Sequence, residues 1–152
     1  MPDLLAGTTM LALDTPAAVS AVASASYDTT STAYTTATSG GAYAEVAVVF
    51  VAPTSGRVRC DLAARLTNNG TGGTLVTAEV RTGSTVGAGT VVDAATDASG
   101  TSNYGNTLSR TGICRFLSGL APGSTYNARL VHRVTAGTGS IAMRELSVQP
   151  LP

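Results

Sequence analysis

The residue types that most often carry catalysis are few in this chain, and their spacing matches no catalytic motif. Its single histidine is His132, in the segment RLVHRV, and neither a CxxC nor an HxxxH spacing occurs. Because a zinc site needs several converging His, Cys or carboxylate ligands, we expect no metal site and a structural or surface role for His132. The GxSxG elbow of serine hydrolases is also absent.

The remaining candidates for chemistry are carboxylates, a glycine-rich segment and aromatic side chains. The nine acidic residues are scattered, so no pair stands out as a glycosidase couple. The segment GSTVGAG lacks the GK[ST] of a phosphate-binding loop. With no Trp, two Phe and five Tyr, the chain also lacks the aromatic platform typical of proteins that bind carbohydrate or single-stranded nucleic acid. We therefore expect no enzyme, no catalytic residue and no cofactor.

Arginine supplies every positive side-chain charge, and three arginines share one predicted strand face. Nine basic residues, none of them lysine, balance nine acids, so no net field attracts nucleic acid or a membrane surface. Arg57, Arg59 and Arg65 occupy the same face as Asp61 in a segment of alternating polarity. They are solvated, pair with Asp61 and with acids across an interface, or hold an anion. We predict these three arginines as contacts with a partner subunit.

The segment with the three arginines is the second half of residues 46–66, which show the clearest strand pattern in the chain. Residues 57–66 alternate between polar and apolar side chains, which is typical of a half-buried strand. Residues 46–51, VAVVFV, have little polar face, which favours a strand covered on both sides. Pro53 and Gly56 lie between the two strands and suit a reversal of the chain. We predict a hairpin whose first strand is interior.

The other segments read as further short strands separated by Gly, Pro and Asn turns. Residues 75–81, 107–118, 126–134 and 141–148 are strand-like, residues 93–106 are a long polar loop, and Pro122-Gly123 suits a type II turn. About eight strands without a long helix predict an all-β protein, an antiparallel jelly-roll β-sandwich. The alternative is a fibronectin type III or immunoglobulin-like sandwich.

The chain of 152 residues is expected to form one domain with an N-terminal arm. The domain covers residues 19–152 and the arm covers residues 1–18. The arm packs on its own domain or docks on a neighbouring subunit; in the second case its partner contacts are Leu4, Leu5, Met10, Leu11 and Leu13. No basic n-region marks a signal peptide, and no run approaches the roughly 20 apolar residues of a membrane helix.

Cys60 and Cys114 lie in strand-like segments far apart in the sequence. We expect two small buried thiols, although a bridge between neighbouring strands is also compatible with the sequence. Charged residues make up 12% of the chain, against about 25% in an average globular protein. Such sparse charge suggests that much of the surface is covered by other copies or other proteins.

Two segments carry a resemblance to a known family. The first, VVFVAPTSGRVRCDLAARL, contains an F-x-A-P-x-S-G-R-V pattern from Phe50 to Val58. The second, LAPGSTYNARLVHRVTAGTGSIAMRELSVQPLP, begins within a GL-x-PG-x-x-Y pattern that runs from Gly119 to Tyr126. Together with the opening LLAGTTMLALDTPAAV, they resemble small virion proteins of tailed phages infecting actinobacteria. The domains of those proteins are similar to the trimeric TNF/C1q-like jelly roll. The PG-x-x-Y element also resembles the tyrosine corner of fibronectin type III domains, whose core tryptophan this chain lacks.

The resemblance implies a structural role. We expect a capsid decoration (cement) protein on the exterior of the virion, made in the host cytoplasm, which forms a homotrimer and binds the major capsid protein to bridge capsomers. The alternatives are a tail or fibre component that contacts the host surface, and a carbohydrate-binding or adhesive β-sandwich module. Neither nucleic acid nor a membrane is expected as a partner.

Overall fold

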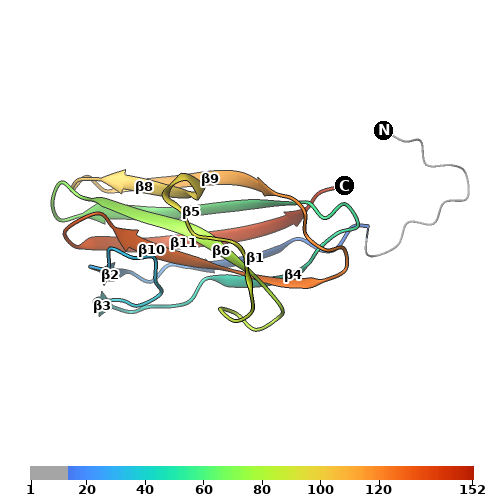
Figure 1. Cartoon of the computed structure of the whole chain (residues 1–152). Helices are drawn as coiled ribbons and strands as arrows, with labels where there is room; N and C mark the ends of the chain where they lie inside the picture. The colour runs from blue at the N-terminus through green and yellow to red at the C-terminus, as the bar shows by residue number, and fades with distance from the viewer. Residues whose placement is uncertain (1–13) are drawn as a thin grey trace, which may run out of the picture.

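Two antiparallel β-sheets face each other in the computed structural model, which describes residues 14–152, and their long strands run along the long axis of the molecule (Figure 1). Sheet one contains β1 (Val19–Ala23), β2 (Tyr27–Thr29), β3 (Gly40–Gly41), β5 (Val58–Asn68), β9 (Ser109–Leu117) and β11 (Gly139–Pro150). Sheet two contains β4 (Ala47–Val51), β6 (Gly73–Thr82), β7 (Val91–Asp93), β8 (Gly100–Tyr104) and β10 (Thr125–Val134). A short 3-10 helix, η1 (Asp97–Ser99), precedes β8.

The order of strand pairing defines a jelly roll. The first strands, β1 and β2, pair with the last strand, β11; β4 pairs with β10, β5 with β9, and β6 with β7 and β8. This is a long antiparallel ribbon rolled on itself, with β11 meeting β5 and β10 meeting β6 across the roll. The predicted jelly-roll sandwich is confirmed. The fibronectin or immunoglobulin alternative is wrong, because those folds place the first strand beside the second.

The core is built by the alternation that the sequence shows in β5. Side chains at even positions from Val58 to Leu66 are almost fully buried between the sheets, whereas those at odd positions face outward. On β6 and β10 most inward positions are likewise small or branched apolar residues, with Tyr126 and His132 as larger exceptions on β10, and they pack against β5 and β11. The predicted faces of residues 57–66 and 75–81 are confirmed.

The predicted hairpin over residues 46–66 is wrong, although both of its strands exist. β4 lies in sheet two and β5 lies in sheet one, so the two strands do not pair. The turn between them pairs with the loop before β10: Ala52 N–H donates to Ser124 O over 3.0 Å, and Leu120 N–H donates to Gly56 O over 3.1 Å. A Cβ at Gly56, which has a φ of +64°, would lie 2.5 Å from Leu120 O. Glycine is therefore needed for this connection between the sheets.

The predicted interior position of residues 46–51 is also wrong. β4 is the edge strand of sheet two, and only its inward side chains, Val48 and Phe50, are buried. Val49 and Val51 face outward and are 39% and 37% exposed. A continuous apolar run is typical of a strand covered on both faces, but here it marks an edge strand with an apolar outer face.

The structure also describes residues 93–106, the two cysteines and the lengths of the helices. The segment 93–106 was predicted to be a polar loop but contains η1 and β8, so that prediction is wrong. Both cysteines are free, and only Cys60 is buried; Cys114 is exposed, because neighbouring positions on the paired strands β5 and β9 point to opposite faces. Within residues 14–152, no helix is long and apolar enough to cross a membrane.

The turn before β10 forms as the sequence predicts. Gly123 has a φ of +76°, and Ser124 N–H donates to Ala121 O over 3.1 Å, which closes a turn with Pro122 and Gly123 at its centre. The Tyr126 hydroxyl accepts a hydrogen bond from Ala121 N–H over 2.9 Å. The contact of a tyrosine corner is therefore present, in a jelly roll instead of the fibronectin fold that the motif suggested.

Candidate interaction surface

The middle of the outer face of sheet two, over β6 and β10, is covered by the chain's own loops. Asn127 on β10 points outward yet is fully buried. Its amide donates to Gly83 O and Ala88 O and accepts from Gly87 N–H over 3.0 Å, which holds the segment 83–90 against the sheet. Because one buried amide satisfies three backbone groups of the loop, this cover is a fixed part of the fold.

A second cover lies further along β10. The Arg133 guanidinium donates hydrogen bonds to both carboxylate oxygens of Asp97 in η1, and the Tyr34 hydroxyl donates to the same carboxylate over 2.9 Å. The hydrogen bonds from Arg133, followed by those from Tyr34, lower the pKa of Asp97. Burial, then the bond to Asp97, raises the pKa of Tyr34 to about 12. The segments around residues 34 and 97 are thereby fastened to sheet two.

The outer face of sheet one, in contrast, carries no such loop among the described residues. We call it the open face; it is formed by the outward side chains of β1, β11, β5 and β9: Ser20, Val22, Glu145, Ser147, Gln149, Arg59, Asp61, Ala63, Arg65, Arg110, Gly112, Cys114 and Phe116. Five of these thirteen side chains are small and uncharged, and five are charged. Phe116 is 68% exposed and Val22 is 76% exposed, so two large apolar side chains lie on this face.

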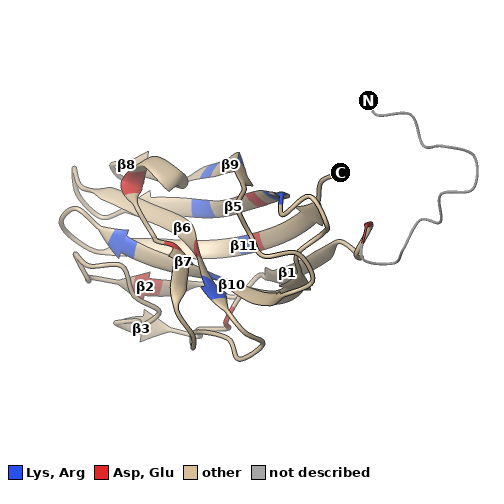
Figure 2. Cartoon of the chain, turned by 45° about the vertical axis from the view of Figure 1, so that its right-hand side comes forward, with Lys and Arg blue, Asp and Glu red and all other residues tan. Residues whose placement is uncertain are grey.

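The five charged residues of the open face mostly neutralise one another, since four of them form two ion pairs. Figure 2 shows them as isolated blue and red positions on a largely tan ribbon. Arg59 pairs with Asp61 at 2.9 Å, and Arg110 pairs with Glu145 at 2.8 Å across the intervening strand β5. A face with little net charge does not steer a strongly charged partner, so it suits contact with another uncharged surface.

The structure places two of the three predicted arginines on the open face itself. Arg59 is exposed and already paired with Asp61. Arg65 is half-buried, and its Nε has no hydrogen-bond partner among the described residues. Arg57 is exposed and directly precedes β5, where its carbonyl accepts from Leu151 N–H over 3.0 Å. Whether these arginines contact a partner subunit stays a prediction.

The predicted contacts Leu4, Leu5, Met10, Leu11 and Leu13 lie outside the described residues. β1 begins at Val19, and the Thr54 hydroxyl donates to Asp14 over 2.9 Å. The division into an arm of residues 1–18 and a domain of residues 19–152 therefore stays a prediction.

His132 has a structural role in a buried cluster between the sheets. Its ring nitrogens lie 2.9 Å from the Tyr27 hydroxyl and 2.9 Å from Ala37 O. Burial lowers the pKa of His132, so the neutral ring is favoured. Among residues 14–152, no group of three His, Cys, Asp or Glu side chains could hold a metal ion.

The exposed thiol of Cys114 is held in its neutral form, since the neighbouring Asp61 carboxylate raises its pKa.

No protein-family model matches the chain, and no curated protein matches its sequence. Several solved structures are similar to it in strand arrangement. The Eiger TNF of S. frugiperda matches with 10% identity and a TM-score of 0.49, over 89% of this chain and 93% of that chain. Infectious bursal disease virus, Gx strain, matches with 13% identity and a TM-score of 0.48, over 90% of this chain and 34% of that chain.

A third similar structure is the enzymatically active domain of tailspike protein 4 from bacteriophage CBA120. It matches with 14% identity and a TM-score of 0.38, over 85% of this chain and 19% of that chain. Likenesses at this level concern the β-sandwich alone. The chain is an antiparallel jelly-roll protein, and what it binds has to be argued from its own surface.

The sequence did not indicate the two residues that most distinguish the open face. Phe116 and Val22 alternate with other residues in their strands just as core residues do. Their exposure depends on which side of sheet one the rest of the chain covers, and that is decided by the topology. In residues 109–117 the side chains of Ile113 and Leu117 face inward, and Phe116 lies at a position of the opposite phase. This alternation of side-chain direction was the one signal in the sequence that could have placed Phe116 outward.

Proposed function

We propose that this protein is a structural virion protein, a capsid decoration protein that self-associates as a homotrimer through its open face and clamps neighbouring capsomers. The observation that carries the proposal is the contrast between the middle of sheet two, where loops bury outward side chains of β10, and sheet one, where Phe116 and Val22 are the two most exposed large apolar side chains among residues 14–152. Large apolar side chains exposed on a sheet face with little net charge favour contact with another protein surface. The resemblance of the two sequence segments to actinobacteriophage virion proteins supports the same role.

The mechanism on this proposal is passive and needs no catalysis. A rigid jelly roll presents one face to its own copies, which leaves the loops at the ends of the sandwich and the predicted arm for the major capsid protein. Each contact with the shell is weak, but three copies in one trimer multiply their binding through effective concentration. The strength of attachment then depends on trimer formation.

The first experiment measures oligomeric mass by sedimentation equilibrium. We expect a trimer for the wild-type chain, a shift toward monomer for Val22→Ser on the open face, and an unchanged trimer for Val92→Ser. Val92 is a matched control, because it is an exposed valine on β7 of sheet two. A monomeric wild-type chain, or equal behaviour of the two variants, contradicts the proposed interface.

The second experiment tests the role on the shell. Purified protein is mixed with assembled capsids of an actinobacteriophage that lack it and with isolated capsid subunits, and co-sedimentation is measured. We expect binding to assembled shells and little binding to isolated subunits. Failure to bind shells, or density of the protein on the tail instead of the head in electron micrographs, contradicts the decoration role.

A further inference from the structure

Arg144 is a charged side chain turned into the sandwich by a bulge in β11. Pairing with β5 shifts by one residue between Ala142 and Glu145, and Met143 within this bulge has a φ of +46°. The shift changes which positions face the core, so that Arg144 falls in phase with buried Leu146. A non-glycine residue at positive φ is unfavourable, which marks this bulge as a feature with a purpose beyond regular pairing.

The guanidinium of Arg144 is only partly satisfied by the described residues. The side chain is 1% exposed, and Nη1 donates to Ala44 O over 2.7 Å. The guanidinium carbon lies 4.5 Å from the centre of the Tyr27 ring and 5.4 Å from that of Tyr43. Nε and Nη2 have no hydrogen-bond partner there, and the buried Tyr43 hydroxyl has none either. Burying a cation without a counter-charge is unfavourable, and the two rings offset that cost only in part.

Two other arginines of the chain show what the Nε–Nη2 edge of a guanidinium binds. Arg81 donates from Nε and Nη2 to the two oxygens of Glu79 over 2.7 and 3.1 Å. Arg133 uses the same two nitrogens on the two oxygens of Asp97. The Nε–Nη2 edge forms two parallel hydrogen bonds with a carboxylate in both cases. On Arg144 the same edge lacks any partner among residues 14–152.

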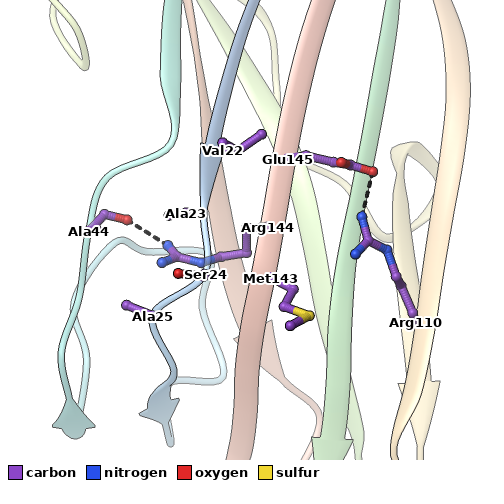
Figure 3. Close-up of a pocket in the computed structure, with 9 residues that line it drawn as sticks. All are labelled: Val22, Ala23, Ser24, Ala25, Ala44, Arg110, Met143, Arg144 and Glu145. Atoms are coloured by element: carbon purple, nitrogen blue, oxygen red, sulfur yellow. Dashed lines mark hydrogen bonds and ion pairs between the residues drawn. The ribbon is translucent and has the colours of Figure 1, made fainter.

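A pocket of about 490 Å³ lies beside this guanidinium. It forms where the sheet is interrupted twice, because the chain between β1 and β2 leaves the sheet opposite the bulge of β11. Figure 3 shows Ala25 and Ala44 on either side of the guanidinium, with Ser24 next to it. The one acidic residue that lines the pocket, Glu145, is paired with Arg110 on the far side of β5. The wall next to Arg144 is therefore formed by small, uncharged residues.

We propose that this pocket binds a carboxylate on the Nε–Nη2 edge of Arg144. The small walls suit a short aliphatic carboxylate, whether it is free in solution or the side chain of an aspartate or glutamate in another copy of the chain. Both nitrogens are buried, so binding requires a small outward movement of Ser24 and Ala25, which lie between β1 and β2. This inference does not depend on the proposed virion role.

The direct test is nuclear magnetic resonance of the arginine Nε–H groups in the full-length chain. Sodium acetate is titrated at constant ionic strength against sodium chloride, and the nine Nε–H signals are followed. We expect the Arg144 signal to shift saturably with acetate while that of Arg133, whose edge already holds Asp97, stays constant. A shift that follows protein concentration without acetate identifies a carboxylate of another copy as the ligand. No saturable change of the Arg144 signal in either titration overturns the proposal.

Variants provide a second measurement, in which acetate raises the midpoint of thermal unfolding. We expect the rise to vanish in Arg144→Gln and to persist in Arg59→Gln, the matched control on the open face. Ala25→Leu fills the pocket without removing the charge, so it should also abolish the rise, and it decides the matter if Arg144→Gln does not fold. A wild-type rise in Ala25→Leu overturns the proposal.

Discussion

The two outer faces of this sandwich are treated differently by the same chain. On sheet two, even outward side chains such as Asn127 and Val131 are buried, because loops are fastened over them. On sheet one, outward Phe116 and Val22 are left in solvent. Covering a face takes ordered loops and satisfied polar groups, and both have an entropic cost. Apolar residues are exposed on sheet two as well, but they lie on the outer strands β4, β7 and β8, whereas the middle strand β10 is covered.

The largest effect on stability is expected when the cover of sheet two is broken. Asn127→Ala removes the amide that satisfies backbone groups of Gly83, Ala88 and Gly87, and leaves them buried without a partner. We expect a loss of about 2 to 4 kcal/mol in the free energy of unfolding, measured by urea denaturation. Ser147→Ala on the open face is the control, with a change of less than about 0.5 kcal/mol. Equal losses in the free energy of unfolding for the two variants would show that the loop over sheet two contributes no more to stability than the side chains of the open face.

The next effect concerns His132, which links β10 to β2 and to the segment that crosses the edge of the sandwich. Burial lowers its pKa in the folded chain, whereas the unfolded chain has the ordinary value of about 6.5. The unfolded state then binds the proton more readily, so stability is complete above about pH 6.5 and falls below it. The loss approaches about 1.4 kcal/mol per pH unit.

Urea denaturation at several pH values between 7.5 and 5.5 measures this loss. Asp97 and Glu79 have pKa values below their ordinary range, so their contributions are lost only at lower pH and do not interfere. His132→Gln should flatten the dependence in this window. A wild-type chain as stable at pH 5.5 as at pH 7.5 would contradict the prediction.

A smaller effect is expected at the second cover. Asp97→Asn keeps the size of the side chain but removes the charge that Arg133 holds. Because Asp97 is largely exposed, we expect a loss of less than about 1 kcal/mol. Backbone amide exchange in residues 30–39 should nevertheless accelerate, since Tyr34 loses its charged acceptor. Unchanged exchange there would show that the cover is held by other contacts, such as the pairing of Thr35 with His132.

The smallest effect on stability is expected at Phe116. Phe116→Ser changes the free energy of unfolding by less than about 0.5 kcal/mol at low protein concentration, because the ring is mostly in solvent. The same variant should weaken self-association measured by light scattering. Tyr104→Ser, an exposed aromatic residue on β8, is the control for association. A variant that loses stability but associates normally would place Phe116 in the domain's own packing.

The sequence was sufficient for the local features of the fold. Alternating polarity identified the faces of β5, and Pro122-Gly123 identified the turn before β10, because both depend on neighbouring residues only. The pairing of strands was not accessible in the same way. A strand, a turn and a strand at residues 46–66 look like a hairpin whether the chain reverses within one sheet or crosses to the other. Contacts with the loop before β10, distant in the sequence, decide between the two.

The candidate surface was predicted only in part for a related reason. Arg59 and Arg65 were placed on the correct side of their strand, since alternation determines side. Which side of a sheet remains uncovered depends on where the loops go, and no local pattern reports that. Arg144 was not singled out, because the sequence AMREL gives no sign of the bulge that turns it inward.

The position of β11 has a consequence for how the protein is made. This strand is inserted between β5 and the pair β1 and β2, so the earliest and latest segments of the domain complete one sheet together. Sheet one cannot close while residues 139–150 are still within the ribosome. Folding dominated by such distant pairings is slow, in the range of about milliseconds to seconds. A chain cut short before Gly139 would expose two unpaired strand edges, and we expect it to aggregate rather than fold into a smaller version of itself.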